Sequence, residues 1–351
     1  MPTVLDAWWP GMREVDVRPL AGTGLSGVPL FLVRPAGDGE AFVLKAFAAG
    51  TSWDRARWVH GLVRHLTAHG IDAVPPVVAA RDGETVVTDH EGTLWEAVRF
   101  VTGAAHEVPT AKQAAAALAT LAGLHRAAES LPGVDSGSGP APAVVRRIEQ
   151  ARRLRDLPWH VRRAEVAADR RDTVAAFLAR WDRAIDAFAA CRGGRAVDAI
   201  AASAVPSVRV QPVLRDVWSE HVLFANADPE RVAGIVDFHA AGVDTPATDL
   251  SRLLGSWRPP ALEPRESLVE RWPEALAAYE AVRPLDAAER RLIPFLHASA
   301  IVLGLDNWFR WTIEEGRRFG DARAALARIE RLSAELPAAL EWLADRPPNC
   351  V

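Results

Sequence analysis

A change of pattern near Thr102 constrains the fold of this chain more than any other feature. Before it, short segments rich in β-branched residues are separated by Gly, Pro and Asp-Gly breaks, as is typical of strands joined by turns. One segment, from about Ser52 to His69, has apolar residues at helical spacing instead. After Thr102, helical periodicity dominates. The pattern predicts an α+β fold with two lobes: a small antiparallel β-sheet lobe with one main helix (1–100) and a larger helical lobe (101–351).

Strand signals are concentrated in the first lobe. They fall on the segments VDVRPL, VPLFLVRP, EAFVLKAF, VPPVVAAR, ETVVTD and LWEAVRFV. The second lobe contains one strong strand pair, in which Val222–Phe224 and Val232–Val236 flank a polar Asn-Ala-Asp-Pro turn. A Gly/Ser/Pro-rich linker is expected at 136–142. The sequence therefore predicts a single hairpin, at 213–238, within an otherwise helical lobe.

Chemically active side chains lie at both ends of this predicted hairpin. Arg215 and Asp216 form a short loop before it, His221 follows five residues after the aspartate, and Asp237 ends its second strand. A hairpin brings its flanking residues together, so two carboxylates distant in sequence meet at one end of a small sheet. This is the arrangement needed to hold a metal-bound phosphate beside a proton acceptor. The segment predicts phosphoryl-transfer chemistry.

The first lobe adds two features that suit a nucleotide. Gly22, Gly24 and Gly27 stand in GxGxxG order between two strands, where backbone N–H groups can approach phosphate oxygens without a Cβ in the way. A plain hairpin turn is the alternative interpretation. Lys45 ends the next strand, and it is one of only two lysines among 41 basic residues. An ammonium at that place can bridge nucleotide phosphates, or it can be a solvated strand-end lysine.

Composition excludes several classes of protein. A net charge of −4 favours neither nucleic acid nor an anionic membrane as a general partner. Two cysteines argue against a disulfide scaffold and fit a reducing cytoplasm. No secretory signal and no apolar run of membrane-spanning length are recognisable. We expect a cytoplasmic protein without a membrane partner.

The segments LRDVWSEHVLF, IVDF and DTPATDL together resemble the aminoglycoside phosphotransferase family, which has a protein-kinase-like fold. The resemblance extends from the glycine loop through Leu254 and implies ATP and Mg²⁺ or Mn²⁺ as cofactors, with a hydroxyl group of a small molecule as acceptor. It places residues of this chain in family roles: the catalytic base and its neighbour (Asp216, Arg215), a metal ligand (Asp237), the phosphate-binding lysine (Lys45), a brace of the catalytic loop (Asp249), and backbone contacts to adenine (Arg99, Val101).

Several residues depart from the family pattern. Leu214 replaces the usual histidine, and His221 stands where the family has a metal-binding asparagine. Imidazole suits Zn, Mn or Fe better than Mg²⁺. His221 can bind a different metal, hydrogen-bond a phosphate, or fill space in an inactive site. The 53–69 helix also lacks a glutamate to pair with Lys45, and His239 follows Phe238 where a small or acidic residue is common. A pseudokinase-type nucleotide-binding or scaffold protein is therefore the alternative function.

Three other signals are weaker. Nine arginines between residues 146 and 171 alternate with acids, which favours a salt-bridged exposed helix over a site for an anionic substrate or RNA. His65 and His69 lie one helical turn apart, but no third metal ligand accompanies them. Trp218, within the catalytic loop, can form a wall of the acceptor site. The helices on that side show no acidic cluster for a polycation, so the resemblance does not identify the acceptor.

Overall fold

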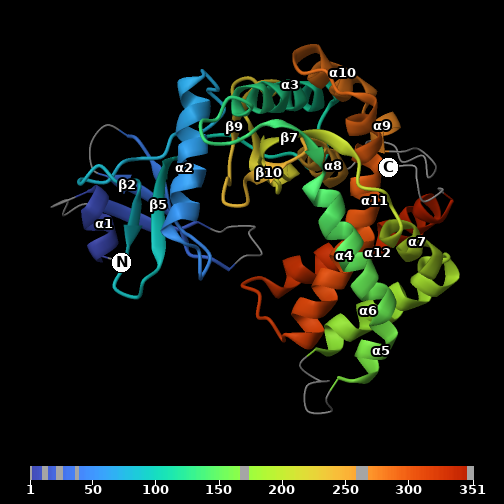
Figure 1. Ribbon diagram of the computed structural model, residues 1–351. Helices are drawn as coiled ribbons and strands as arrows, with labels where there is room; N and C mark the ends of the chain where they lie inside the picture. The colour runs from blue at the N-terminus through green and yellow to red at the C-terminus, as the bar shows by residue number, and fades with distance from the viewer. Residues whose placement is uncertain are drawn as a thin grey trace.

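The computed structural model describes residues 2–9, 15–20, 27–35, 39–166, 174–257 and 268–345. The chain has the predicted α+β architecture, with a sheet-containing N-terminal lobe beside a larger, mainly helical C-terminal lobe (Figure 1). We propose to divide the lobes after residue 100. There, the Phe100 N–H still bonds to the Ala41 carbonyl in the first lobe, whereas Ala104 already pairs with Phe224 in the second. Gly22 and Gly24 lie outside the described residues.

The N-terminal lobe is an antiparallel five-stranded sheet in the order β1-β2-β3-β5-β4. Val33, Leu44 and Ala97 belong to the main apolar cluster of this lobe, and Val86 and Leu94 belong to a second, smaller one. In the β3–β5 register, Lys45 stands directly opposite Glu96. Its strands are β1 (Val15–Pro19), β2 (Leu30–Pro35), β3 (Phe42–Ala46), β4 (Val86–Thr88) and β5 (Leu94–Arg99).

Two helices pack on this sheet, α1 (Pro2–Trp8) and α2 (Trp53–Ala68). Ser52 caps α2 by accepting a hydrogen bond from the Arg55 N–H at 3.2 Å. The strand predicted at VPPVVAAR does not form; only an isolated bridge from Val77 to Val98 is present. Two consecutive prolines lack the N–H groups that a strand ladder needs, which explains the failure.

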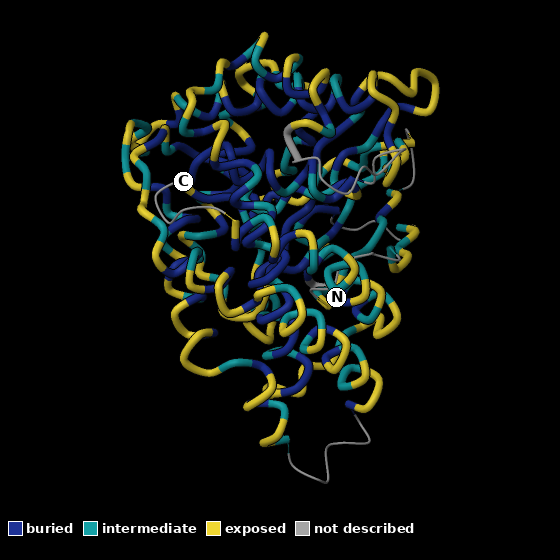
Figure 2. The backbone as a smooth tube through the Cα atoms, turned by 90° about the vertical axis from the view of Figure 1, so that its right-hand side faces the viewer, coloured by how far each residue is buried: buried dark blue, intermediate teal, exposed yellow. Residues whose placement is uncertain are grey.

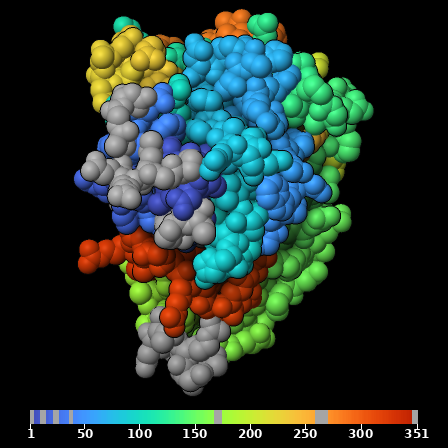
Figure 3. All heavy atoms as spheres, turned by 90° about the vertical axis from the view of Figure 1, so that its left-hand side faces the viewer, coloured from blue at the N-terminus to red at the C-terminus, as the bar shows by residue number. Residues whose placement is uncertain are grey.

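The C-terminal lobe is built mainly from helices around one large apolar core, and much of the backbone inside the molecule is buried (Figure 2). Its largest fully buried side chains include Trp181, Tyr279, Phe224 and Phe309. Its helices are α3 (Ala111–Ala128), α4 (Pro142–Asp156), α5 (Trp159–Ala164), α6 (Ala175–Ala190), α7 (Gly193–Ala201), α8 (Ala247–Ser256), α9 (Leu268–Arg271), α10 (Pro273–Val282), α11 (Ala287–Phe309) and α12 (Ala322–Ala344). Viewed from the side of the N-terminal lobe, the red C-terminal segment lies below that lobe (Figure 3).

Two small sheets are inserted among these helices. The predicted hairpin forms as β8 (Val222–Phe224) and β9 (Val232–Ile235). A second sheet joins β6 (Gly137–Pro140), β7 (Ser207–Val213) and β10 (Gly242–Asp244). The prediction of a linker at 136–142 is therefore wrong in part, because its small residues pair antiparallel with β7. The segment has the composition of a turn, but Gly and Pro are tolerated in an edge strand, and β6 lies at the edge of its sheet.

The arginine-rich helices are less exposed than expected. Arg162 on α5 retains only 3% side-chain exposure and pairs with Asp306 of α11, which is fully buried. Arg153 on α4 binds the same carboxylate. A buried acid is tolerated only when it is paired, so these two arginines anchor α4 and α5 to the core and are not part of an open anion-binding surface.

The segment Ala287–Glu314 is long and apolar enough to cross a membrane by length and composition. However, 78% of its most apolar window is buried inside the lobe, as in a core helix. The helix α11 begins at a capping residue, Asp286, which accepts a hydrogen bond from the Glu289 N–H at 2.7 Å.

Candidate active site

The loop after β7 carries the predicted catalytic pair. Asp216 remains 47% exposed, and its carboxylate accepts a hydrogen bond from the Trp218 indole N–H at 2.8 Å. Arg215 has a positive φ of 66°, a conformation that is strained for a non-glycine residue. Its guanidinium lies against Gly242 of β10, where an added Cβ would meet Nη1 at 2.4 Å. The strained turn thus leaves the carboxylate of Asp216 open while the side chain of Arg215 packs on β10.

Asp249, the first acidic residue of α8, is fully buried and holds this loop in place. Its carboxylate accepts hydrogen bonds from the backbone N–H groups of Leu214 at 2.7 Å and Arg215 at 2.6 Å. His125 of α3 donates from Nε2 to the same carboxylate at 3.0 Å. The histidine Nδ1 then accepts from the Tyr279 hydroxyl at 2.7 Å. Burial raises the pKa of Tyr279, which keeps this donor protonated.

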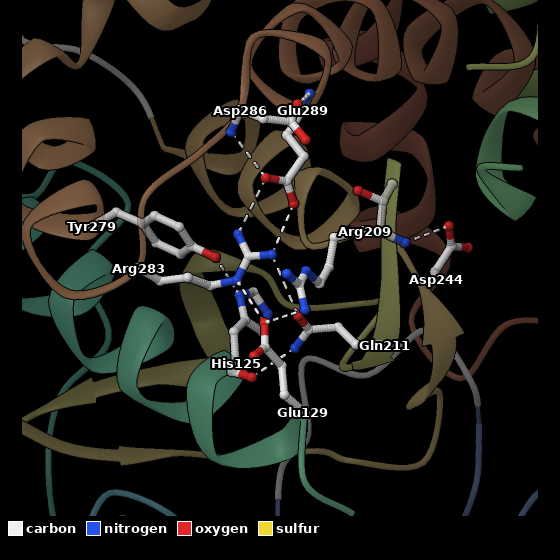
Figure 4. Close-up of polar contacts among 10 residues, drawn as sticks. His125, Glu129, Arg209, Gln211, Asp244, Tyr279, Arg283, Asp286 and Glu289 are labelled. Carbon is white, nitrogen blue, oxygen red and sulfur yellow. Dashed lines mark hydrogen bonds and ion pairs between the residues drawn. The ribbon is translucent and has the colours of Figure 1, made fainter. Parts of the chain in front are cut away.

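The brace continues into a buried polar network behind the loop (Figure 4). Gln211 of β7 donates to the His125 carbonyl at 2.6 Å and faces Arg283, which pairs with Glu289 at 2.8 Å. Neither His125 nor Arg283 was identified from the sequence. No motif marks them, because Tyr279 lies 154 positions from His125 and Gln211 lies 72 positions from Arg283.

The second acid, Asp237, follows β9 and meets the N-terminal lobe. Its Oδ1 lies 2.6 Å from Nζ of Lys45, joining the two residues that the sequence placed at the ends of separate strands. Burial opposes ionisation of Asp237, but the charge and the hydrogen bond of Lys45 hold its pKa below the ordinary value. Asp237 also has a positive φ, 67°. Both predicted acidic loops are therefore strained at a single residue.

Glu96 supplies a carboxylate that the sequence did not point to. It is 6% exposed and lies between two imidazoles: His60 of α2 donates to Oε2 and His239 to Oε1, each at 2.7 Å. Thr85 completes the chain at Nδ1 of His60, 2.7 Å away. Burial opposes the charge of Glu96, but the charges and hydrogen bonds of both histidines hold its pKa well below the usual range.

Lys45 has Asp237 as its partner, in place of the helix glutamate that the sequence lacks. The helix α2 indeed has no glutamate, but it reaches the Asp237 loop through His60 and Glu96. Arg55 of α2 adds a second link by donating to the carbonyl of His239 at 2.8 Å and to that of Ala241. The ring of His239 also stacks on Phe47, with centroids 4.1 Å apart. The departure at position 239 thus has a structural role.

His221 has a defined orientation. Its Nδ1 lies 2.9 Å from the Asp216 carbonyl, a contact that requires Nδ1 to carry the proton. The Trp218 N–H also lies 3.4 Å from Nδ1, a longer contact that would need a lone pair on this nitrogen. A protonated Nδ1 has no lone pair to offer. Nε2 is left with the free lone pair. Metal-binding histidines are commonly oriented in this way, by an N–H to a backbone carbonyl.

Of the remaining predicted residues, some have backbone or open space available to a ligand and others are used inside the fold. Gly27 adopts a φ of 67°, and open space surrounds the position of a Cβ. The Arg99 N–H is used inside the fold, by the Pro76 carbonyl. The side chain of Val101 packs on Gly234 of β9, while its backbone has no hydrogen-bond partner among the described residues. His65 bonds to the Ala127 carbonyl, and the described part of the chain holds no cluster of three or more metal-binding side chains.

Comparison with known proteins shows the family of the chain. Residues 29–285 match the model of the phosphotransferase enzyme family known as APH. The chain is 29% identical over 262 residues to a homoserine kinase of Xanthobacter autotrophicus, covering 74% of this chain and 70% of that one. It is 27% identical over 296 residues to a homoserine kinase of Ralstonia nicotianae, covering 81% and 78%.

Solved structures share the fold at low sequence identity. A spectinomycin phosphotransferase in complex with ADP and spectinomycin superposes with a TM-score of 0.63 at 12% identity, covering 99% of this chain and 94% of that one. An amicoumacin kinase in complex with AMP-PNP and Ca²⁺ gives 0.62 at 15% identity, covering 96% and 91%. At such identities the likeness supports the kinase-like fold alone.

Proposed function

The chain belongs to the APH phosphotransferase enzyme family, and from that premise we propose that it transfers the γ-phosphate of ATP to a hydroxyl group of a small molecule. The observation that carries the proposal is the 2.6 Å contact between Lys45 and Asp237, which joins the two lobes, while the carboxylate of Asp216 in the loop after β7 stays open. The similarity to homoserine kinases and to small-molecule kinase structures supports the substrate size.

The nucleotide is proposed to lie between the lobes. Lys45 supplies a point charge for its phosphates, the glycine loop ending at Gly27 covers them, and Val101 offers a free backbone N–H and C=O to adenine. The similar amicoumacin kinase contains AMP-PNP, which supports a nucleoside triphosphate. A cytoplasmic location is part of this proposal and rests on the low cysteine count.

A divalent cation fits the donors at the loop. Asp237 offers an ionised carboxylate, and His221 an imidazole whose Nε2 lone pair is free. These two residues would hold the ion, and Mg²⁺ or Mn²⁺ would supply charge neutralisation for the transferred phosphate. The mixed oxygen and nitrogen donor set favours Mn²⁺ more than the usual carboxylate and amide pair does.

Asp216 is proposed to act on the acceptor. Its carboxylate accepts a hydrogen bond from the acceptor hydroxyl, orients the oxygen towards the γ-phosphorus and receives the hydroxyl proton. A new P–O bond forms to the acceptor as the bond to the bridging oxygen breaks, and ADP leaves. Asp249, which is itself held by His125, limits the movement of the loop because its carboxylate binds the backbone N–H groups of Leu214 and Arg215. Such positioning contributes much of the catalysis in phosphoryl transfer.

The test is turnover with ATP and either Mg²⁺ or Mn²⁺, in the wild type and in an Asp216→Asn variant. The variant should lose about 10²- to 10⁴-fold in kcat while its affinity for ATP stays the same. Asp228→Asn, at an exposed turn of the same hairpin, is the matched control and should retain activity. A wild-type protein that binds no nucleotide would contradict the proposal.

A second candidate function is nucleotide binding without transfer. The observation that favours it is His221, which takes the place of a family asparagine at the metal site. ATP binding at the wild-type site, with no turnover across a broad acceptor panel in either metal, would support this second function over the first.

A further inference from the structure

A group of arginines surrounds the catalytic loop on the side of the C-terminal lobe. They come from the loop itself and from three helices, α4, α8 and α12, which can be followed in Figure 1. Their charges are close enough to disfavour one another: burial and the neighbouring Arg331 and Arg252 lower the pKa of Arg328 to about 10. The set, here called the basic cluster, consists of Arg146, Arg147, Arg215, Arg252, Arg328 and Arg331.

Part of the basic cluster has internal partners. Arg146 forms an ion pair with the fully buried Asp244. Arg147 donates to two backbone carbonyls, and burial with the charges of Arg252 and Arg146 lowers its pKa to about 9. Arg331 donates to the carbonyls at the end of α8 and lies 3.6 Å from Glu335. These three arginines are held by the fold.

Arg252 and Arg328 differ from the rest. Both guanidinium groups lie over the indole ring of Trp218, with Cζ 4.6 Å and 3.6 Å from its centroid. The carboxylate that approaches Arg252 is Asp216 itself, at 3.5 Å. Across the described ranges, no carboxylate lies within 4 Å of the Arg328 guanidinium. Two positive charges are thus gathered beside the proposed base, and the acids that act on Arg328, Glu220 and Glu335, form no ion pair with it within 4 Å.

This arrangement selects against one type of acceptor and for another. Trp218 fixes the two guanidinium planes by cation–π contact, at the cost of repulsion between like charges. A bound oxyanion relieves that repulsion and can take paired N–H donors from guanidinium groups. A polycationic acceptor would be repelled by these guanidinium groups, as they repel each other.

We propose that the acceptor is a small hydroxyl compound with a carboxylate or phosphate group, and that Arg252 and Arg328 bind this group while the hydroxyl faces Asp216. The inference rests on the proposed function and adds the substrate class. It assigns Arg252 and Arg328 as specificity-determining residues and Trp218 as the platform that orients them.

The experiment compares matched acceptors in the intact protein with saturating ATP. Hydroxy acids and sugar phosphates are each assayed beside the neutral amide or sugar that lacks the anion, and an aminoglycoside serves as the cationic probe. Binding of the same compounds is measured by calorimetry with a non-hydrolysable ATP analogue and Mg²⁺ filling the nucleotide site, so that compounds that bind without turnover are also scored.

Anionic acceptors should be preferred, and Arg328→Gln should raise their KM by about 10- to 100-fold while leaving KM for ATP unchanged. Arg328→Lys should restore part of the affinity. Arg323→Gln, at an exposed arginine of the same helix, is the control and should have no effect. Arg328 carries the test because, unlike Arg252, it has no ion pair with Asp216.

The outcomes separate the two proposals. If the anionic compounds neither react nor bind better than their neutral counterparts, the anionic acceptor is contradicted, even when ATP binding and turnover of a neutral compound uphold the kinase function. An unchanged preference in Arg328→Gln also contradicts it. Failure to bind ATP at all rejects the function on which this inference rests.

Discussion

The network of His60, Glu96 and His239 shows what single residues contribute to this site. Lys45, Asp216 and Asp237 could be proposed from the sequence because motif spacing and the hairpin identify them. Glu96 could not, although it stands opposite Lys45 in the sheet. Strand β4 lies between β3 and β5 in the chain, but in the sheet it lies at the edge, and β3 pairs directly with β5. The sequence alone does not show that Lys45 of β3 faces Glu96 of β5.

Replacing Glu96 by glutamine tests this network. Glu96→Gln removes the charge that both histidines face and leaves one imidazole without a good acceptor inside the fold. Loss of such buried, charge-assisted bonds should cost about 1–3 kcal/mol in the free energy of unfolding, and KM for ATP should rise because the Asp237 loop is held through His239. Urea unfolding and initial-rate kinetics measure the two effects. Glu84→Gln, in an exposed pair with Arg57, should change neither.

His221 permits a prediction on the metal. In His221→Asn an amide oxygen replaces the free imidazole nitrogen, and oxygen donors suit Mg²⁺. The ratio of activity with Mg²⁺ to activity with Mn²⁺ should therefore rise about tenfold. The ratio is measured at saturating metal, with His106→Asn as a control outside the loop. An unchanged ratio would show that His221 is not a metal ligand.

At the scale of elements, the connector between the lobes is fitted closely to the hairpin. Ala104 and Phe224 exchange both backbone hydrogen bonds, at 2.9 Å and 2.8 Å. Beside them, a Cβ on Gly103 would meet the Phe224 carbonyl oxygen at 2.6 Å. The expected element types were mostly confirmed, but this contact joins segments about 120 positions apart, and no local pattern indicates it.

Two glycine substitutions should therefore have opposite effects. Gly103→Ala forces the connector away from β8 and should destabilise the protein by about 1–3 kcal/mol. Gly61→Ala, inside α2 and with open space at the Cβ position, should stabilise it by about 0.5–1 kcal/mol. Thermal and urea unfolding report both. Equal effects of the two changes would mean that the close approach of the connector has no energetic consequence.

For the whole molecule, a partly buried histidine links stability to pH. His297 of α11 is 19% exposed, and burial together with Arg271 and Arg331 lowers its pKa to about 4. Glu335 lies 3.9 Å away, too far for a strong hydrogen bond that would oppose this. The folded protein therefore keeps this imidazole neutral, whereas the unfolded chain protonates it near pH 6.5.

The sign of the pH effect follows. The contribution of His297 is complete above pH 6.5 and is lost as pH falls towards 4, because the unfolded state binds the proton first. Between pH 7 and pH 5 the loss should be about 2 kcal/mol. Urea unfolding at both values should show a smaller difference in His297→Gln than in the wild type, whereas exposed His90→Gln should behave as the wild type. An identical pH dependence in all three proteins would refute this assignment.

The location of the Glu96 carboxylate also has a consequence for regulation. In protein kinases the glutamate that organises the phosphate-binding lysine lies on a helix, and movement of that helix switches activity. Here the carboxylate that pairs with Lys45 is Asp237 of the C-terminal lobe, and Glu96 stands opposite Lys45 in the sheet and binds His60 of α2. The pairing of β3 with β5 fixes the backbones of Lys45 and Glu96 relative to each other. We therefore expect that movement of α2 does not switch this chain in the way that a helix glutamate switches protein kinases.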